Sequence, residues 1–120
     1  MERGSDNKKT RILIVDGNSD ILLTFTKALE VYGQFEADTF KDPIEALSRF
    51  KVKTYDLQII DIRLPQMDGF ELYDKMKEID NEVKVCFMTA YDINIKALSS
   101  DLEACFIGKP IDMHMNLLLA

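Results

Sequence analysis

The chain has 120 residues, of which 47% are hydrophobic and 30% charged, and its formal net charge is −6 at pH 7. This length suits one compact domain with its own core and is too short for two. The acidic balance excludes direct binding to DNA or RNA, because nucleic-acid binding needs a basic surface. No apolar run reaches the ~18 residues of a transmembrane helix, so we expect no membrane contact.

The first nine residues are polar and lack the apolar core of a signal peptide. We expect residues 1–9 to form a flexible tail and residues 10–120 to form a single cytoplasmic domain. The two cysteines, Cys86 and Cys105, have no metal-ligand spacing. We therefore expect both to be buried thiols in a reducing cytoplasm.

The first predicted strand is the apolar run 11–16, which reads as a strand covered on both faces. A helix capped by Asn18 or Ser19 follows, because apolar residues then recur at helical spacing. Gly33 supplies the stop signal for this helix.

Residues 35–40 predict a short second strand. Asp42 and Pro43 then give an N-cap followed by proline at the first position of a second helix. The third strand is predicted at 56–61, and residues 65–69 form a loop after it.

The third predicted helix carries its apolar residues on one face: Leu72, Met76 and Ile79. A fourth strand is expected at 83–88, with Thr89 at its end.

The last part of the chain repeats this alternation. We expect a helix at 92–99, a fifth strand at 104–107 and a last helix that begins near Ile111. Strict alternation of strands and helices predicts a parallel sheet with helices on both faces.

Four polar residues lie at or just past the carboxyl ends of predicted strands: Asp16, Asp61, Thr89 and Lys109. Ligands of such sheets bind beyond the carboxyl ends of the strands, where the strand order reverses. A carboxylate there can attack phosphorus and form an aspartyl phosphate. Because both reactants are negative, the step needs a divalent cation and positioned donors, which a lysine ammonium and a threonine hydroxyl provide.

Over residues 11–118 the chain resembles the receiver domain of two-component response regulators. The matching stretches, in this order and spacing, are ILIVD at 12–16, IIDIRLPQMDG at 59–69, FMTA at 87–90 and GKP at 108–110. The resemblance implies an α/β, flavodoxin-like fold: a doubly wound five-stranded parallel sheet in the order 2-1-3-4-5, with helices on both faces.

The resemblance also implies the function of a phosphorylation-controlled signalling switch. Asp61 would accept a phosphoryl group from a histidine kinase or phosphotransfer protein. The face formed by helix 4, strand 5 and helix 5 would then change its binding to a downstream protein or effector domain. Such a domain is not an enzyme in the ordinary sense, since it catalyses at most its own phosphotransfer and autodephosphorylation.

The same resemblance assigns residues to the metal and the phosphoryl group. Asp16, Asp61 and the backbone carbonyl of Arg63 would hold Mg²⁺, and Thr89 and Lys109 would contact the phosphoryl group.

Further roles follow from the same comparison. Thr89 and Phe106 match the switch positions, and Arg63 and Tyr91 match variable positions that tune the lifetime of the phosphorylated state. The peptide bond before Pro110 matches one that is usually cis in the family.

Gly17 departs from the family pattern, which usually has two adjacent acids after the first strand. With one carboxylate fewer, Mg²⁺ binding should be weaker, since ligand charge governs the affinity for hard cations. Asp20 is no substitute, because it falls in the first turn of the predicted helix. The alternative function is therefore a degenerate receiver that binds partners independently of phosphorylation.

The last predicted helix is short and ends in the apolar residues 117–120. This end indicates a truncated helix, a helix that continues into further sequence, or the contact of a homodimer.

Two enzymatic or cofactor-binding alternatives remain. A haloacid-dehalogenase-type phosphatase needs a second acid two residues after the nucleophile, where this chain has Arg63. A flavin carrier on the same fold needs a phosphate loop rich in glycine and hydroxyl groups, and residues 17–20 are too acidic and too short for one. A colourless protein would exclude the flavin carrier, and the absence of phosphatase turnover would exclude the phosphatase.

Overall fold

The computed structural model describes residues 9–89 and 105–108 of the chain. Strands in this part form one parallel sheet in the order β2-β1-β3-β4-β5. Their bounds are Thr10–Val15 for β1, Phe35–Phe40 for β2, Leu57–Asp61 for β3, Val85–Thr89 for β4 and Cys105–Gly108 for β5. The predicted flavodoxin-like sheet and its strand order are confirmed.

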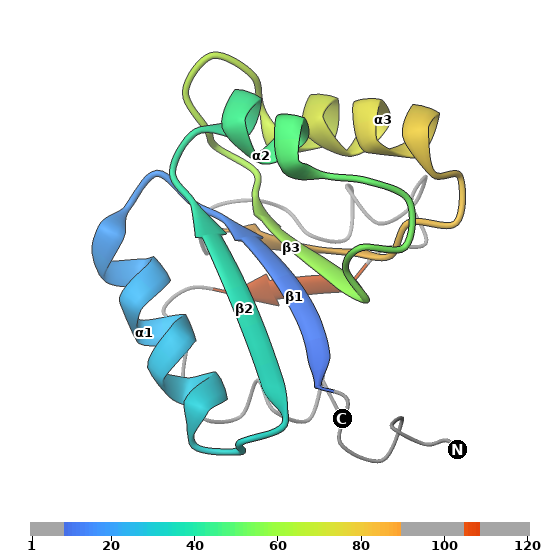
Figure 1. Ribbon diagram of the computed structural model, residues 1–120. Helices are drawn as coiled ribbons and strands as arrows, with labels where there is room; N and C mark the ends of the chain where they lie inside the picture. The colour runs from blue at the N-terminus through green and yellow to red at the C-terminus, as the bar shows by residue number, and fades with distance from the viewer. Residues whose placement is uncertain (1–8, 90–104, 109–120) are drawn as a thin grey trace, which may run out of the picture.

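Helices cover both faces of the sheet, as expected for a doubly wound fold. Helix α1 (Ser19–Glu30) lies on one face, and α2 (Pro43–Arg49) and α3 (Gly69–Ile79) lie on the other (Figure 1). None of these helices is long and apolar enough to cross a membrane. The helices expected at 92–99 and after Ile111, and most of the expected tail, lie outside the described residues.

Helix α1 begins where its cap is predicted. The side chain of Asn18 accepts hydrogen bonds from the backbone N–H groups of Asp20 (2.8 Å) and Ile21 (3.4 Å). These bonds satisfy N–H groups that have no partner within the helix. The chain leaves the helix just before Gly33, whose φ of 68° is readily adopted only by glycine.

The other two helices also begin at side-chain caps. Asp42 accepts from the N–H of Ile44 (2.8 Å), with proline in the first turn of α2. At α3, Asp68 accepts from the N–H of Glu71 (2.9 Å), while the Glu71 carboxylate accepts from the N–H of Asp68. This reciprocal capping box follows the D-x-x-E pattern at 68–71, which would have placed the helix start from sequence.

The core consists of two apolar layers, one on each face of the sheet. The layer beneath α1 includes Ile12, Phe25 and Ile59. The layer beneath α2 and α3 includes Leu72 and Phe87. Because successive strand residues point to opposite faces, the central strands supply both layers, and the uninterrupted apolar run of β1 is explained.

A polar cluster links β1, β2 and the segment before β3. Tyr55 Oη donates to Asp38 Oδ2 (2.6 Å), and Arg11 Nη2 lies 3.3 Å from the same oxygen. The Arg11 guanidinium carbon is 5.1 Å from the centre of the Tyr55 ring. The backbone N–H of Arg11 donates to Asp56 Oδ2 (2.8 Å). Residues of β1, β2 and the segment before β3 are thereby tied together at the end of the sheet opposite the predicted site.

The prediction of two free thiols is wrong. Cys86 and Cys105 form a disulfide, and their Cα atoms are 4.4 Å apart. The physical reason is the strand register, which places Cys86 of β4 directly opposite Cys105 of β5. A pairing between neighbouring strands is set by the tertiary fold, so the spacing of the two cysteines in the sequence could not show it.

Candidate functional site

Two carboxylates meet at the carboxyl ends of the central strands. Val15 of β1 pairs with Ile60 of β3, so the residues that follow them, Asp16 and Asp61, are neighbours at the same edge of the sheet. They lie where the strand order reverses, since β1 continues to β2 on one side and contacts β3 on the other. Both side chains are buried, with exposed fractions of 1% and 8%.

Asp16 is fixed by the backbone on both sides of the strand end. Its N–H donates to the carbonyl of Phe40 at the end of β2 (3.0 Å). Its Oδ1 accepts from the N–H of Asn18 (2.8 Å). Asn18 therefore caps α1 with its side chain and orients Asp16 with its backbone, a link that the sequence pattern did not reveal.

The end of β3 is held beside the end of β4. Asp61 pairs with Met88, and the N–H of Ile62 donates to the Met88 carbonyl (3.1 Å). Thr89 is thereby placed at the same edge as Asp61, and its backbone pairs with Gly108 of β5. The backbone thus brings three of the four predicted strand ends together.

Several predicted site residues lie outside the described residues: Lys109, Pro110 and Tyr91. The side chain of Thr89 is likewise not described.

Gly69 permits a close approach between α3 and the end of β3. Its N–H donates to the carbonyl of Ile62 (2.8 Å). A Cβ atom at this position would lie 2.5 Å from the carbonyl oxygen of Asp61 and 2.9 Å from the Cα of Ile62. Only glycine allows this contact, so Gly69 supports the backbone of the candidate nucleophile. The sequence showed the glycine but not the neighbour that requires it.

A tight turn closes the loop between β3 and α3. Gln66 has a φ of 70°, and the N–H of Met67 donates to the carbonyl of Pro65 (2.7 Å). A three-residue turn with positive φ at a side-chain-bearing residue is a costly conformation. The turn buries Met67 against the core, while Arg63 is exposed at the start of the loop.

Gly17, which follows Asp16 directly, has room for a side chain. A Cβ atom here would have Pro65 Cδ as its nearest neighbour, at 3.7 Å, which is an ordinary contact. Asp20 is exposed in the first turn of α1, as expected.

The two acids at the strand ends are ligands of the kind that Mg²⁺ prefers. Within residues 9–89 and 105–108, no three His, Cys, Asp or Glu side chains gather closely enough to hold a metal ion together. Asp16 and Asp61 supply two buried carboxylates, and Mg²⁺ commonly takes one or two carboxylates and completes its shell with water.

Phe106 is half-buried on the α3 face of β5. Its ring centre is 5.7 Å from that of Phe87, which also contacts Phe70 and Tyr73 at 4.8 and 5.8 Å. The predicted switch residue therefore belongs to an aromatic cluster that links β4, β5 and α3.

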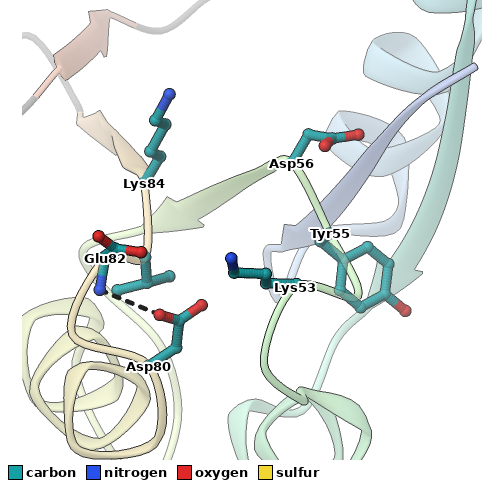
Figure 2. Close-up of a pocket in the computed structure, with 7 residues that line it drawn as sticks. Lys53, Tyr55, Asp56, Asp80, Glu82 and Lys84 are labelled. Atoms are coloured by element: carbon teal, nitrogen blue, oxygen red, sulfur yellow. Dashed lines mark hydrogen bonds between the residues drawn. The ribbon is translucent and has the colours of Figure 1, made fainter.

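A separate pocket lies at the opposite end of the sheet, before β3 and β4, and Figure 2 shows its charged rim. Two of its acids bind backbone groups: Asp80 accepts from the N–H of Glu82 (3.0 Å), and Asp56 accepts from Arg11. Lys53, on this rim, has a φ of 60°. The engaged acids give the rim a structural role, and we assign no ligand to it.

The sequence model that describes the response regulator receiver domain family matches residues 12–117 of this chain. The chain is 33% identical over 106 residues to the response regulator receiver protein CpdR of Brucella abortus, covering 87% of this chain and 88% of CpdR. It is 33% identical over 107 residues to sporulation initiation phosphotransferase F of Bacillus subtilis, covering 86% and 84% of the two chains.

Other relatives are longer. The match to the transcriptional regulatory protein PrrA of Mycobacterium leprae has 35% identity and covers 67% of this chain but 34% of PrrA. The match to the sensor protein EvgS of Escherichia coli covers 9% of that protein.

Among solved structures, the non-phosphorylated HemR receiver domain of Leptospira biflexa superposes with a TM-score of 0.79 at 28% identity, covering 92% of this chain and 90% of that one. A CheY-like receiver domain protein of Methanospirillum hungatei gives a TM-score of 0.79 at 29% identity, covering 93% and 90%.

Proposed function

Because the chain belongs to the response regulator receiver domain family, we propose that it is a signalling switch that accepts a phosphoryl group on Asp61. The observation that carries this proposal is the pair of buried carboxylates, Asp16 and Asp61, held side by side at the carboxyl ends of β1 and β3. A buried acid pair is costly unless a cation or hydrogen bonds offset its charge.

In the proposed reaction, a carboxylate oxygen of Asp61 attacks the phosphorus of a phosphohistidine on a kinase or phosphotransfer protein. The phosphorus–nitrogen bond breaks, and its electron pair stays on the imidazole. The relative from Bacillus subtilis, named as a phosphotransferase and matched over 84% of its length, supports phosphoryl transfer. The Lys109 ammonium and the Thr89 hydroxyl would hold the phosphoryl oxygens.

A bound Mg²⁺, held by Asp16, Asp61 and the carbonyl of Arg63, would neutralise charge between the acid and the phosphoryl group. We infer that this cation is weakly held, because Gly17 supplies no carboxylate. The protein would act in the cytoplasm as a regulatory phosphoacceptor rather than an enzyme, with autodephosphorylation as its only turnover. The roles of Arg63 and Tyr91 would be to tune the lifetime of the phosphorylated state.

The proposed output is a change in partner binding. Engagement of Thr89 with the phosphoryl group would let the Phe106 ring move further inward, and the surface formed by helix 4, strand 5 and helix 5 would change with it. A downstream protein, an effector domain or a second copy joined through the last helix would read that surface.

A small-molecule phosphodonor tests the acceptor directly. Incubation with acetyl phosphate and millimolar Mg²⁺ should add one phosphoryl group by intact mass, and peptide mapping should place it on Asp61. Asp61→Asn should abolish the adduct. Asp74→Asn is the matched control, because Asp74 is an exposed acid on α3, and it should leave the adduct unchanged.

The degenerate receiver is the second candidate, and Gly17 is the observation that favours it. If the wild type stays unphosphorylated and the Gly17→Asp variant gains the adduct, the degenerate receiver is the correct assignment. A wild type that is phosphorylated under the same conditions would exclude it.

A further inference from the structure

The disulfide between Cys86 and Cys105 joins the two strands that carry the proposed switch residues. Cys86 lies three residues before Thr89 in β4, and Cys105 is adjacent to Phe106 in β5. The two cysteines are direct register partners. The bond therefore links β4 and β5 covalently at the first of their register pairs.

The bond and the aromatic contact lie on opposite faces of the same strand pair. Cys86 is 1% exposed and packs in the apolar layer beneath α1. Phe87 and Phe106, one residue further along each strand, pack in the layer beneath α3. Because side chains alternate between faces, the sulfur link and the ring contact brace the strand pair from both sides.

A reversible role for the bond follows from the cytoplasmic location that is part of the proposed function. Disulfides in reducing compartments are uncommon and are usually transient or redox-sensing. These 120 residues contain no third cysteine, so no other pairing competes within them. Cys105 is half-buried whereas Cys86 is 1% exposed, so Cys105 is the more exposed residue of the pair.

We propose that Cys86 and Cys105 are a reversible thiol–disulfide pair that, when oxidised, fixes β5 in register on β4. The oxidant is a low-molecular-weight disulfide. The Cys105 thiolate attacks one of its sulfurs and releases one small thiol, and a mixed disulfide forms. The Cys86 thiolate then attacks the Cys105 sulfur and releases the second small thiol, so two protons and two electrons leave the protein.

The consequence for signalling rests on the proposed function. A fixed β5 holds Phe106 against Phe87, so the oxidised protein should resist the inward movement of Phe106 that phosphorylation is proposed to cause. The reduced protein, in which β5 is held by backbone hydrogen bonds and packing alone, should respond to phosphorylation.

The first arm of the test measures bond formation. Fully reduced protein is incubated with oxidised glutathione, alkylated under denaturing conditions and weighed. The expected product is a monomer lighter by two hydrogens that takes up no alkylating reagent. Two alkylated thiols, a lasting glutathione adduct or a disulfide-linked dimer would overturn the proposal. Cys105→Ala is the control, because it cannot form the internal bond and its truncation removes a partly exposed side chain.

The second arm measures the effect on β5 by amide hydrogen exchange. The amides of Phe106 and Ile107 should exchange at least about tenfold more slowly in the oxidised protein, while those of β1 should not change. Equal rates in both forms, or an equal change in Cys105→Ala, would overturn the fixing of β5.

A third arm separates this proposal from the proposed function. Failure of the reduced protein to take a phosphoryl group on Asp61 would overturn the phosphoacceptor role. The mass and exchange results decide the thiol pair independently.

Discussion

Gly17 follows Asp16 directly and has room for a side chain, which leads to a prediction about the cation. Because a Cβ at Gly17 would make only an ordinary 3.7 Å contact, Gly17→Asp should fold normally. We expect Mg²⁺ to bind roughly tenfold more tightly, since a third carboxylate raises the charge of the site. Isothermal titration with MgCl₂ measures this.

Gly17→Ala is the control for this change. It should gain about 0.4–1 kcal/mol of stability by restricting the unfolded chain, with no change in Mg²⁺ affinity. An Asp variant with wild-type affinity would show that position 17 does not face the cation.

Gly69 has the opposite surroundings, because its backbone is pressed against the end of β3. Gly69→Ala places a Cβ 2.5 Å from the Asp61 carbonyl, so the helix or the strand end must move. We expect a loss of about 2 kcal/mol in urea unfolding, typical of an overpacked contact. Phosphorylation of Asp61 should also slow, because its backbone is displaced.

The variant Gly33→Asn tests whether the stability loss expected at Gly69 comes from steric crowding or from backbone conformation. Gly33 has a positive φ of 68° but nothing within 4 Å of a Cβ, and asparagine tolerates this conformation better than most residues. We expect a loss below about 1 kcal/mol and normal phosphorylation. Comparable losses at both glycines would contradict the crowding argument.

At the scale of the elements, Gln58 is a polar residue in the middle of the sheet. It is 1% exposed, and its Nε2 donates to the Lys84 carbonyl (2.7 Å), which also accepts from the Gln58 N–H (2.9 Å). Its Oε1 has no hydrogen-bond partner within the described residues.

Gln58→Met keeps the size of the side chain and removes the buried acceptor. Because the Lys84 carbonyl retains its backbone donor, we expect unchanged stability or a gain of up to about 1 kcal/mol in chemical denaturation. A clear loss would mean that the amide does more for β3 and β4 than these contacts show. Gln58→Glu, which buries a charge at the same place, should be strongly destabilising.

Tyr55 gives the amino-terminal ends of the strands a pH dependence. Burial, and then the hydrogen bond to Asp38, raises the pKa of Tyr55 from 10.0 to about 12. The folded protein therefore keeps this proton more tightly than the unfolded chain does. The stability from Tyr55 is complete below pH 10 and is lost as the pH rises from 10 towards 12.

The melting temperature of the wild type should thus fall more steeply between pH 10 and about 12 than that of Tyr55→Phe, which lacks the phenol. The difference in phenolate absorbance between the wild type and Tyr55→Phe reports Tyr55 alone. It should titrate with a pKa of about 12. Parallel declines in the two proteins would contradict the assignment.

The elements and strand-end acids were predictable because each has a local cause. The run before Asp16 is apolar on both faces, Asn18 and Asp42 are strong caps, and alternation implies a parallel sheet. The remainder depends on contacts between distant segments. The need for Gly69 and the pairing of Cys86 arise only when β3 meets α3 and β4 meets β5.

At the scale of the whole molecule, the net charge of −6 and the buried acids predict a specific response to Mg²⁺. A ligand that binds only the folded state stabilises it by mass action, so raising Mg²⁺ from the dissociation constant to 100 times that value should add roughly 2 kcal/mol. Thermal unfolding at constant ionic strength, balanced with NaCl, separates this effect from general screening.

Asp16→Asn should weaken the response to Mg²⁺, and Asp74→Asn should retain it. An identical rise in melting temperature with NaCl alone would show that the stabilisation reflects screening of the acidic surface and not a site between β1 and β3.

The room beside Gly17 also has a genetic consequence. Glycine and aspartate codons such as GGU and GAU differ by one nucleotide, and a Cβ at position 17 makes only an ordinary contact. We therefore expect that a third carboxylate can be gained or lost in a single mutational step. Selection could set how readily such a protein responds at the magnesium level of a cell, while the surfaces that recognise its partners stay the same.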